Sequence, residues 1–395
     1  MTARGARDRA LLWGVVAVVS VLAGCETPAA LSPSDSAPSA THALASPSAV
    51  ASPDDTPSAS TPGNPSAVSI ELHALDARYV PAVAPISSGG QVLWTAGESW
   101  PSELWRYVPG SPEPERLFAS PREASSISAV AAASSGYAFV ELSKPAFGKG
   151  GWRIWFLSGP GEEPVELDRG RARGAGFAPT IAMDDERIAW AGFDEPPTGA
   201  VSKLSTVSIA DLDAVTELRN LPIRDGLLWY PTLNGDELWY GIIRADFDLT
   251  GVGDEFHLET LDLANPAAPP VRFPGKGNDF NPAANDSFVA WKTTEPGDSA
   301  LNWGTLHVMD RRTQAVAKIP VAKVDRPSIG DRYVAFEEIS RSRLAVYDTQ
   351  TGSVVDLAPP GSPGSYGGQS LSGRLLTFYT QTGEKPQIGW AILPE

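Results

Sequence analysis

Residues 280–319 read FNPAANDSFVAWKTTEPGDSALNWGTLHVMDRRTQAVAKI, and this stretch decides the fold. It contains four short segments with strand character, which begin with Phe280-Asn281-Pro282 and continue at residues 287–293, 304–310 and 315–319. An Asn-Asp turn, a longer loop and an Arg-Arg-Thr turn separate them. Alternation of apolar and polar residues, as around Leu306 and Val308, is typical of half-buried strands. The stretch therefore predicts a small antiparallel sheet of four strands.

The same plan recurs along the chain. Seven short apolar runs each close on an aromatic residue, and successive aromatics lie about 42 to 52 residues apart. These aromatics are Trp94, Phe139, Trp190, Trp239, Trp291, Phe336 and Phe378. A period of about 40–50 residues filled with short strands is the signature of a β-propeller, with one repeat per blade. We expect the aromatics to pack between blades; a β-sandwich with chance spacing is the alternative fold.

The last repeat contains only three strands before the chain stops, whereas an unassigned alternating segment, Val68 to Leu75, precedes the first repeat. If this N-terminal segment supplies the missing outer strand, the ring closes and leaves no open seam between its ends. We therefore predict an all-β propeller of seven four-stranded blades, closed by the N-terminal strand. Six blades are the alternative.

The pattern Pro–turn–Val-Ala-Trp–loop–Leu-x-Val-Tyr-Asp-x-x-Thr-Gly resembles the TolB-like and WD-like propeller repeats of bacterial envelope proteins. The resemblance covers residues 68–395, and its motifs imply a fold rather than a function. The chain departs from TolB because no small α/β domain precedes the propeller, and because the usual Ser-Pro-Asp-Gly turn is reduced to Gly330-Asp331 in one repeat. A Tol–Pal partnership is therefore not implied.

Residues 1–24 have the features of a signal peptide. Arg4, Arg7 and Arg9 precede an apolar stretch that is too short to span a bilayer. Leu22-Ala23-Gly24-Cys25 then resembles the lipobox of bacterial lipoproteins, in which the cysteine receives the lipid, and Cys25 is the only cysteine of the chain. We predict a lipoprotein whose mature N-terminus, Cys25, carries diacylglycerol and palmitate. An ordinary secretory peptide is the alternative.

Residues 25–67 are rich in Ser, Pro, Ala and Thr and contain little to bury. Such a segment cannot offset its ordering entropy, so we interpret it as a disordered tether between the membrane and a propeller of residues 68–395. The chain has a formal net charge of −16 and its first 24 residues are basic, so the mature protein is more acidic still. Nucleic acid and anionic lipid headgroups would repel it, and the lipid on Cys25 is its expected membrane contact.

The sequence contains no recognisable catalytic constellation. Three histidines of the predicted propeller, His73, His257 and His307, are scattered around the ring, and no zinc-binding spacing occurs. No Gly-x-Ser-x-Gly motif is present, so a hydrolase of the prolyl-peptidase type has no support. We assign no catalytic residue and no cofactor.

One acidic loop resembles the first half of a calcium-binding loop. Asp246, Asp248, Thr250 and Asp254 place oxygen atoms along it, with Gly251 at the sharp turn. The twelfth position, where a bidentate glutamate belongs, is His257. Calcium is thus one hypothesis for this loop, and a solvated acidic hairpin tip is the other.

The candidate ligand-binding face comes from position in the repeats. In propellers of this kind, the loops that lead into the innermost strands and those between the second and third strands share one face around the central channel. Its polar and aromatic residues here are Glu98, Trp100, Tyr230, Asp279, Trp303, Asp325 and Arg326. Aromatic platforms with a few charges suit sugars, peptides or a protein partner.

These observations favour a binding or scaffold protein over an enzyme. We expect a lipid-anchored protein of the bacterial cell envelope that faces outside the cytoplasm and binds a peptide, a glycan or another envelope protein. The alternative is a polysaccharide lyase or glycosidase with its site at the channel mouth, which would need two converging carboxylates or an acid beside a base.

Overall fold

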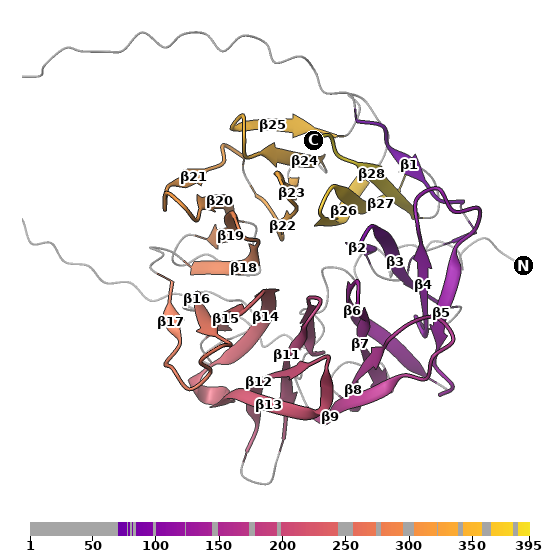
Figure 1. Cartoon of the computed structure of the whole chain (residues 1–395), viewed down its shortest axis with the longest axis vertical. Helices are drawn as coiled ribbons and strands as arrows, with labels where there is room; N and C mark the ends of the chain where they lie inside the picture. The colour runs from indigo at the N-terminus through magenta and orange to yellow at the C-terminus, as the bar shows by residue number, and fades with distance from the viewer. Residues whose placement is uncertain are drawn as a thin grey trace, which may run out of the picture.

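The computed structural model describes residues 70–395 except 77, 80, 82–83, 98–99, 123, 144–148, 174–177, 196–198, 244–255, 274–277, 295–303, 322, 339–342, 358–364 and 382–385. The described residues form seven four-stranded antiparallel sheets, arranged as a ring around a central axis (Figure 1). The first strands of the blades lie nearest the axis. The prediction of a seven-bladed β-propeller is therefore confirmed.

Consecutive strands of the chain pair with one another within each blade. Blade 1 contains β2 (Ile86–Ser88), β3 (Gln91–Ala96), β4 (Glu103–Tyr107) and β5 (Glu115–Ala119). Blade 2 contains β6 (Ser125–Ala133), β7 (Gly136–Ser143), β8 (Lys149–Leu157) and β9 (Val165–Arg173), and blade 3 contains β10 (Thr180–Met183), β11 (Arg187–Asp194), β12 (Val201–Ser208) and β13 (Asp211–Pro222). A short 3₁₀ helix, η1 (Ile223–Asp225), leads into blade 4.

The later blades follow the same order. Blade 4 contains β14 (Leu227–Asn234), β15 (Glu237–Ile243), β16 (Phe256–Asp262) and β17 (Val271–Arg272), and blade 5 contains β18 (Asn278–Ala284), β19 (Phe288–Thr294), β20 (Thr305–Asp310) and β21 (Val316–Lys318). Blade 6 contains β22 (Ser328–Ile329), β23 (Tyr333–Glu338), β24 (Arg343–Asp348) and β25 (Ser353–Asp356). Blade 7 contains β26 (Ser365–Ser372), β27 (Leu375–Gln381) and β28 (Gln387–Ile392), and its fourth strand is β1 (His73–Ala74).

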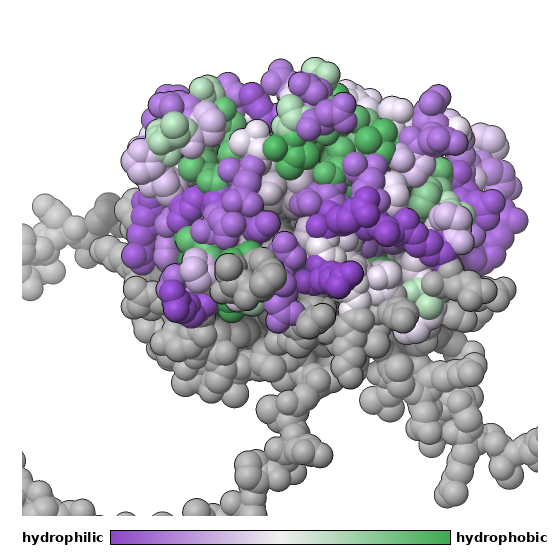
Figure 2. Space-filling view, turned by 90° about the horizontal axis from the view of Figure 1, so that it is seen from below, coloured by the Kyte–Doolittle hydropathy of each residue, from purple (hydrophilic) through white to green (hydrophobic). Residues whose placement is uncertain are grey.

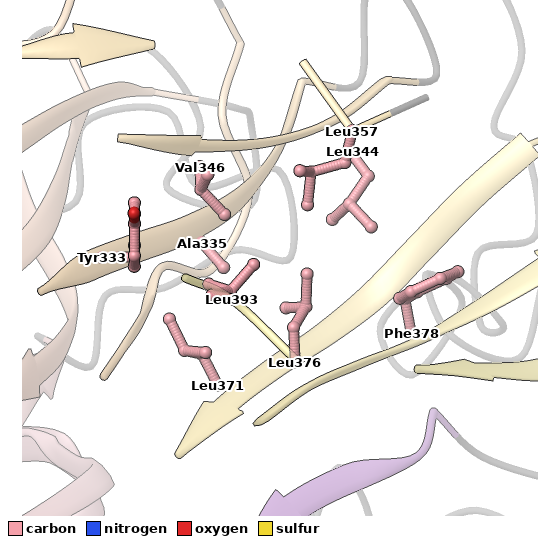
Figure 3. Close-up of a cluster of buried hydrophobic side chains, with 9 residues drawn as sticks. All are labelled: Tyr333, Ala335, Leu344, Val346, Leu357, Leu371, Leu376, Phe378 and Leu393. Carbon is pink, nitrogen blue, oxygen red and sulfur yellow. The ribbon is translucent and has the colours of Figure 1, made fainter. Parts of the chain in front are cut away.

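Apolar residues of neighbouring blades fill the wedges between the sheets. Between blades 6 and 7, Val346 and Leu344 meet Leu376 and Phe378 in one buried cluster (Figure 3). Trp94 is 1% exposed and packs against Leu375 of blade 7. Burial of such large side chains is the main favourable term in folding, so the repeated aromatics hold the ring together, as expected.

The aromatic of blade 4 occupies a different position from its counterparts. Trp291 and Phe336 each lie three residues after the residue at which their strand begins to pair with the following strand. In blade 4 that residue is Glu237, and Trp239 follows it by only two. Since side chains alternate along a strand, Trp239 faces blade 5 rather than blade 3. Tyr240 takes the usual place and packs with Leu204 of blade 3.

The N-terminal strand is shorter than the sequence suggests. Only His73 and Ala74 form β1, which pairs with Trp390 and Gly389 of β28. Leu75 adds a backbone hydrogen bond to Ile388 at 2.9 Å. Residues 68 and 69 lie outside the described residues. Whether this pairing is needed to close the ring stays a prediction.

Hydrophilic residues cover most of the coloured surface at the edge of the ring that Figure 2 shows, with apolar residues gathered in a few patches. In the part of the chain that the structure describes, no helix is long and apolar enough to cross a membrane. The predicted signal peptide, Cys25 and the tether all lie outside the described residues.

Candidate functional site

Three neighbouring blades place large polar residues at equivalent positions beside the central channel. In blades 4 and 5 the first strand bulges at Tyr230 and Asn281, whose φ angles are 46° and 52°. Positive φ is uncommon for residues other than glycine and often marks a functional site. Each of these residues precedes a proline, as does Arg326 in blade 6. Gly368, with φ 59°, takes the equivalent bulge in blade 7, where Ala84 and Tyr379 leave no room for a side chain.

Arg326 reaches across to Tyr230. Its guanidinium carbon lies 4.8 Å from the centre of the Tyr230 ring, and its side chain is exposed. Within the described part of the chain, no carboxylate forms an ion pair with Arg326. The Tyr230 ring is itself held in place, stacked on Trp229 at 5.4 Å and with the edge of Phe280 at 5.6 Å. Arg326 is therefore a charged donor on a rigid aromatic platform.

A second cation, Lys292, is buried beside this platform. Its side chain is 2% exposed, its ammonium lies 5.5 Å from the Phe280 ring, and Asp325 Oδ1 is 3.8 Å away. Among the described residues, none accepts a hydrogen bond from this ammonium. Burial lowers the pKa of Lys292, and Asp325 only partly opposes the shift. A buried charge with so little compensation is costly for the protein and favours an anionic ligand.

Glu337 adds a carboxyl group that is an unusually weak acid. Burial raises its pKa to about 7, the charge of Asp325 adds to the shift, and a hydrogen bond from the Gly368 N–H at 3.4 Å opposes it. Burial also raises the pKa of the nearby Tyr379, followed by the charges of Glu337 and Asp325. We call this group the channel-mouth cluster and define it by the residues Tyr230, Lys292, Asp325, Arg326, Glu337 and Tyr379.

The raised pKa of Glu337 predicts a pH-dependent stability. Its proton is held more tightly in the folded chain, so its contribution is complete below about pH 4.5 and is lost as pH rises through about 7. We expect the free energy of unfolding of the Glu337→Gln variant to fall less than that of the wild type between pH 5 and pH 8, by about 2 to 3 kcal/mol. Denaturant unfolding at each pH measures this difference.

Glu71 provides the control, because its side chain is 83% exposed. The Glu71→Gln variant should follow the wild-type curve across the same pH range. If the Glu337→Gln curve also runs parallel to the wild type, Glu337 is ionised throughout and the pH argument fails.

The structure brings together three of the predicted site residues: Tyr230, Asp325 and Arg326. Trp100 is 43% exposed, and no described contact joins it to them. Asp279 lies apart, since the residue is 3% exposed and its carboxylate accepts hydrogen bonds from Trp291 Nε1 at 3.0 Å and Thr293 Oγ1 at 2.7 Å.

Other predicted site residues are outside the described residues. They are Glu98, Trp303 and the proposed calcium ligands Asp246, Asp248, Thr250 and Asp254. In the part of the chain that the structure describes, no group of three metal-binding side chains comes together. The calcium hypothesis for the loop stays untested.

Three members of the cluster, Lys292, Glu337 and Tyr379, were not predicted. All three follow the closing aromatic of their repeat, in blades 5, 6 and 7. Blades 2 and 3 have the small apolar residues Val140 and Ala191 at this position. A comparison of the repeats with one another would have found this signal, because a buried repeat position normally stays apolar.

Comparison with known proteins supports the fold. No protein-family model matches the chain, and no curated protein matches it. The β-propeller domain of the Trilobed protease from Pyrococcus furiosus is 12% identical, with a TM-score of 0.54 over 82% of this chain and 96% of that one. An oligogalacturonate lyase from Vibrio parahaemolyticus is 10% identical, with a TM-score of 0.51 over 84% and 98% of the two chains.

TolB from Acinetobacter baumannii also matches, at 11% identity over 62% of this chain and 61% of that one. Its TM-score of 0.37 adds no argument for a relationship beyond the propeller. At these identities the likeness to solved structures shows that the chain is a β-propeller and leaves its ligand to be argued from the site.

Proposed function

We propose that this protein is a lipid-anchored binding protein of the bacterial cell envelope, held outside the cytoplasm, whose channel-mouth cluster binds a ligand with carboxylate groups. The ligand is an acidic glycan or the C-terminal end of a peptide. Cys25 and the Ser- and Pro-rich segment after it support the anchor and the tether.

One observation carries the proposed ligand class: the exposed Arg326 guanidinium has no ion-pair partner among the described residues and is held over the Tyr230 ring. A guanidinium offers two parallel N–H donors that match the geometry of a carboxylate. The aromatic ring offers apolar area next to it, which suits a sugar ring or a peptide side chain.

Lys292 supports the same anionic ligand class from beside the platform. The Lys292 ammonium makes no hydrogen bond with any described residue, and its ion pair with Asp325 is long, at 3.8 Å. The Asn281 Oδ1 atom is buried without a donor. Buried polar atoms usually have partners, so the Lys292 ammonium points to an anionic group, and the Asn281 oxygen points to a hydroxyl donor on the ligand or to water.

The pair of carboxyl groups Glu337 and Asp325 favours a second candidate, an enzyme that acts on an acidic polysaccharide. A pKa of about 7 allows Glu337 to exchange a proton near neutral pH, as a general acid or base must. The fold shared with an oligogalacturonate lyase is compatible with this function but is only an analogy.

The test compares two pairs of probes on the full mature chain in detergent: trigalacturonate against its methyl ester, and a peptide with a free C-terminus against its amide. We expect the carboxylate form of one pair to bind and its neutral partner to bind weakly. The Arg326→Ala change should weaken that binding by about 1 to 3 kcal/mol with little change in melting temperature.

Arg224→Ala is the matched control, since this arginine is 85% exposed and lies in η1. It should bind like the wild type. Equal binding of acid and ester, or full binding by the Arg326→Ala variant, would contradict the proposed ligand class. Turnover of trigalacturonate that the Glu337→Gln change abolishes would favour the enzyme instead.

A further inference from the structure

A separate cavity of about 710 Å³ lies between blades 4 and 5. Its size falls in the range of about 300–1,000 Å³ that is typical of small-ligand sites. The outermost strands beside it are short: β17 has two residues and β21 has three, against twelve in β13 of blade 3. The cavity shares no residue with the channel-mouth cluster.

Asp279 contributes a carboxylate to the lining of this cavity. Trp291 and Thr293 both donate to Oδ1, whereas no described residue donates to Oδ2. Burial raises the pKa of Asp279, although the hydrogen bonds and the charges of His307 and Arg272 oppose the shift. Asp279 as a whole is only 3% exposed, and a carboxylate oxygen without a donor is an acceptor site for a ligand.

Trp239 contributes an unused donor to the same lining. Its side chain is 4% exposed, and its Nε1 is buried without an acceptor. The register of blade 4 turns Trp239 toward blade 5. Phe273, which follows β17 of blade 4, packs edge-on against both Trp239, at 5.5 Å, and Trp291, at 4.8 Å. An unsatisfied indole N–H is costly, so a ligand that supplies an acceptor gains binding energy there.

The opening of the cavity combines charge with apolar surface. Arg272 lines it, is exposed, and forms no ion pair with any described residue. Arg311 is neutralised by Glu237, with Nη2 and Oε2 2.5 Å apart. Val271 and Val316 are 66% and 51% exposed on the two outermost strands, so both sides of the opening offer apolar contact. Arg272 is thus the cation left for a ligand.

We propose that this cavity binds a small zwitterion, an amino acid or a di- or tripeptide. The ligand's ammonium group donates to Asp279 Oδ2, while its carboxylate accepts hydrogen bonds from the Arg272 guanidinium and the Trp239 indole. The valines and the aromatic lining contact its side chain. This site is independent of the proposed function at the channel mouth. It uses other charged residues, and its ligand must carry an ammonium group as well as a carboxylate.

Calorimetric titration of the full mature chain with a panel of free amino acids tests the proposal. At least one zwitterion should bind, and its methyl ester and its N-acetyl derivative should each bind at least about tenfold more weakly. The Asp279→Asn and Arg272→Gln variants should show the same loss. Arg272 is exposed, so its variant keeps the test valid if the Asp279 variant folds poorly.

Asp168→Asn is the matched control, because Asp168 also accepts a tryptophan N–H, from Trp190 at 2.8 Å, but lines no part of this cavity. It should bind like the wild type, as should Arg326→Ala. The proposal fails if no zwitterion binds or if the blocked derivatives bind equally well. It also fails if Arg326→Ala removes binding, since the zwitterion then occupies the channel mouth.

Discussion

Replacing Cys25 with serine should release the protein from membranes. A diacylated and acylated cysteine inserts several hydrocarbon chains into the bilayer, each buried CH₂ contributing about 0.8 kcal/mol. Electrostatic attraction offers no substitute, because the chain's formal net charge of −16 repels anionic headgroups. Fractionation of cells that produce the Cys25→Ser variant should find the protein in the soluble extracytoplasmic fraction.

A Ser46→Ala change in the tether serves as the control and should leave the protein with membranes. A wash at high salt separates lipid anchorage from electrostatic adhesion, since salt screens charge but leaves acyl chains inserted. A Cys25→Ser protein that still sediments with membranes after this wash would mean that the anchor lies elsewhere in the chain.

The fold could be predicted because each repeat has the same local chemistry. A run that ends in an aromatic, as at Val289-Ala290-Trp291, can bury its side chains only against a neighbouring sheet. Regular spacing of such runs therefore indicates a ring of similar sheets. The register within a blade is less visible. A shift of one position turned Trp239 toward blade 5, and the apolar run around it looks the same in either register.

The sequence indicated that Tyr230 and Arg326 lie together, and they do, although a ligand-binding role for them stays a prediction. Each precedes a proline in the innermost segment of its blade, and this shared place in the repeat carried the prediction. Lys292 and Glu337 are interior strand residues, a position usually occupied by apolar side chains, and nothing local marks them as functional.

Asp279 shows the opposite limit of sequence reasoning. It precedes Phe280 in the segment that leads into blade 5, so its place in the repeat indicated the channel mouth. In the structure, Phe280 does contact Tyr230 there. Alternation along β18 puts its carboxylate on the Trp291 side instead, between blades 4 and 5. One residue along a strand therefore separates the two candidate sites, a distinction that a loop-based argument cannot make.

Deleting the chain before Pro81 should abolish cooperative unfolding or cause aggregation. The deletion removes β1 and leaves β28 as an open edge, ready to pair with another chain. It also removes Leu75, which is 8% exposed and packs with Trp94 of blade 1 and Ile388 of blade 7. Loss of one such leucine alone costs about 2–5 kcal/mol, against a typical total of about 5–15 kcal/mol.

A protein that begins at Ala67 keeps this strand and should unfold in one transition. Circular dichroism recorded during heating measures this transition. The point variants His73→Ala and Leu75→Ala separate the two contributions. His73 stacks on Trp390 at 4.1 Å near solvent, so its loss should cost little, whereas the Leu75 change opens the wedge between blades 7 and 1. Equal melting of the proteins that begin at Ala67 and Pro81 would mean that contacts between blades 1 and 7, such as Ser87 N–H to Ser370 Oγ at 3.1 Å, hold the ring without β1.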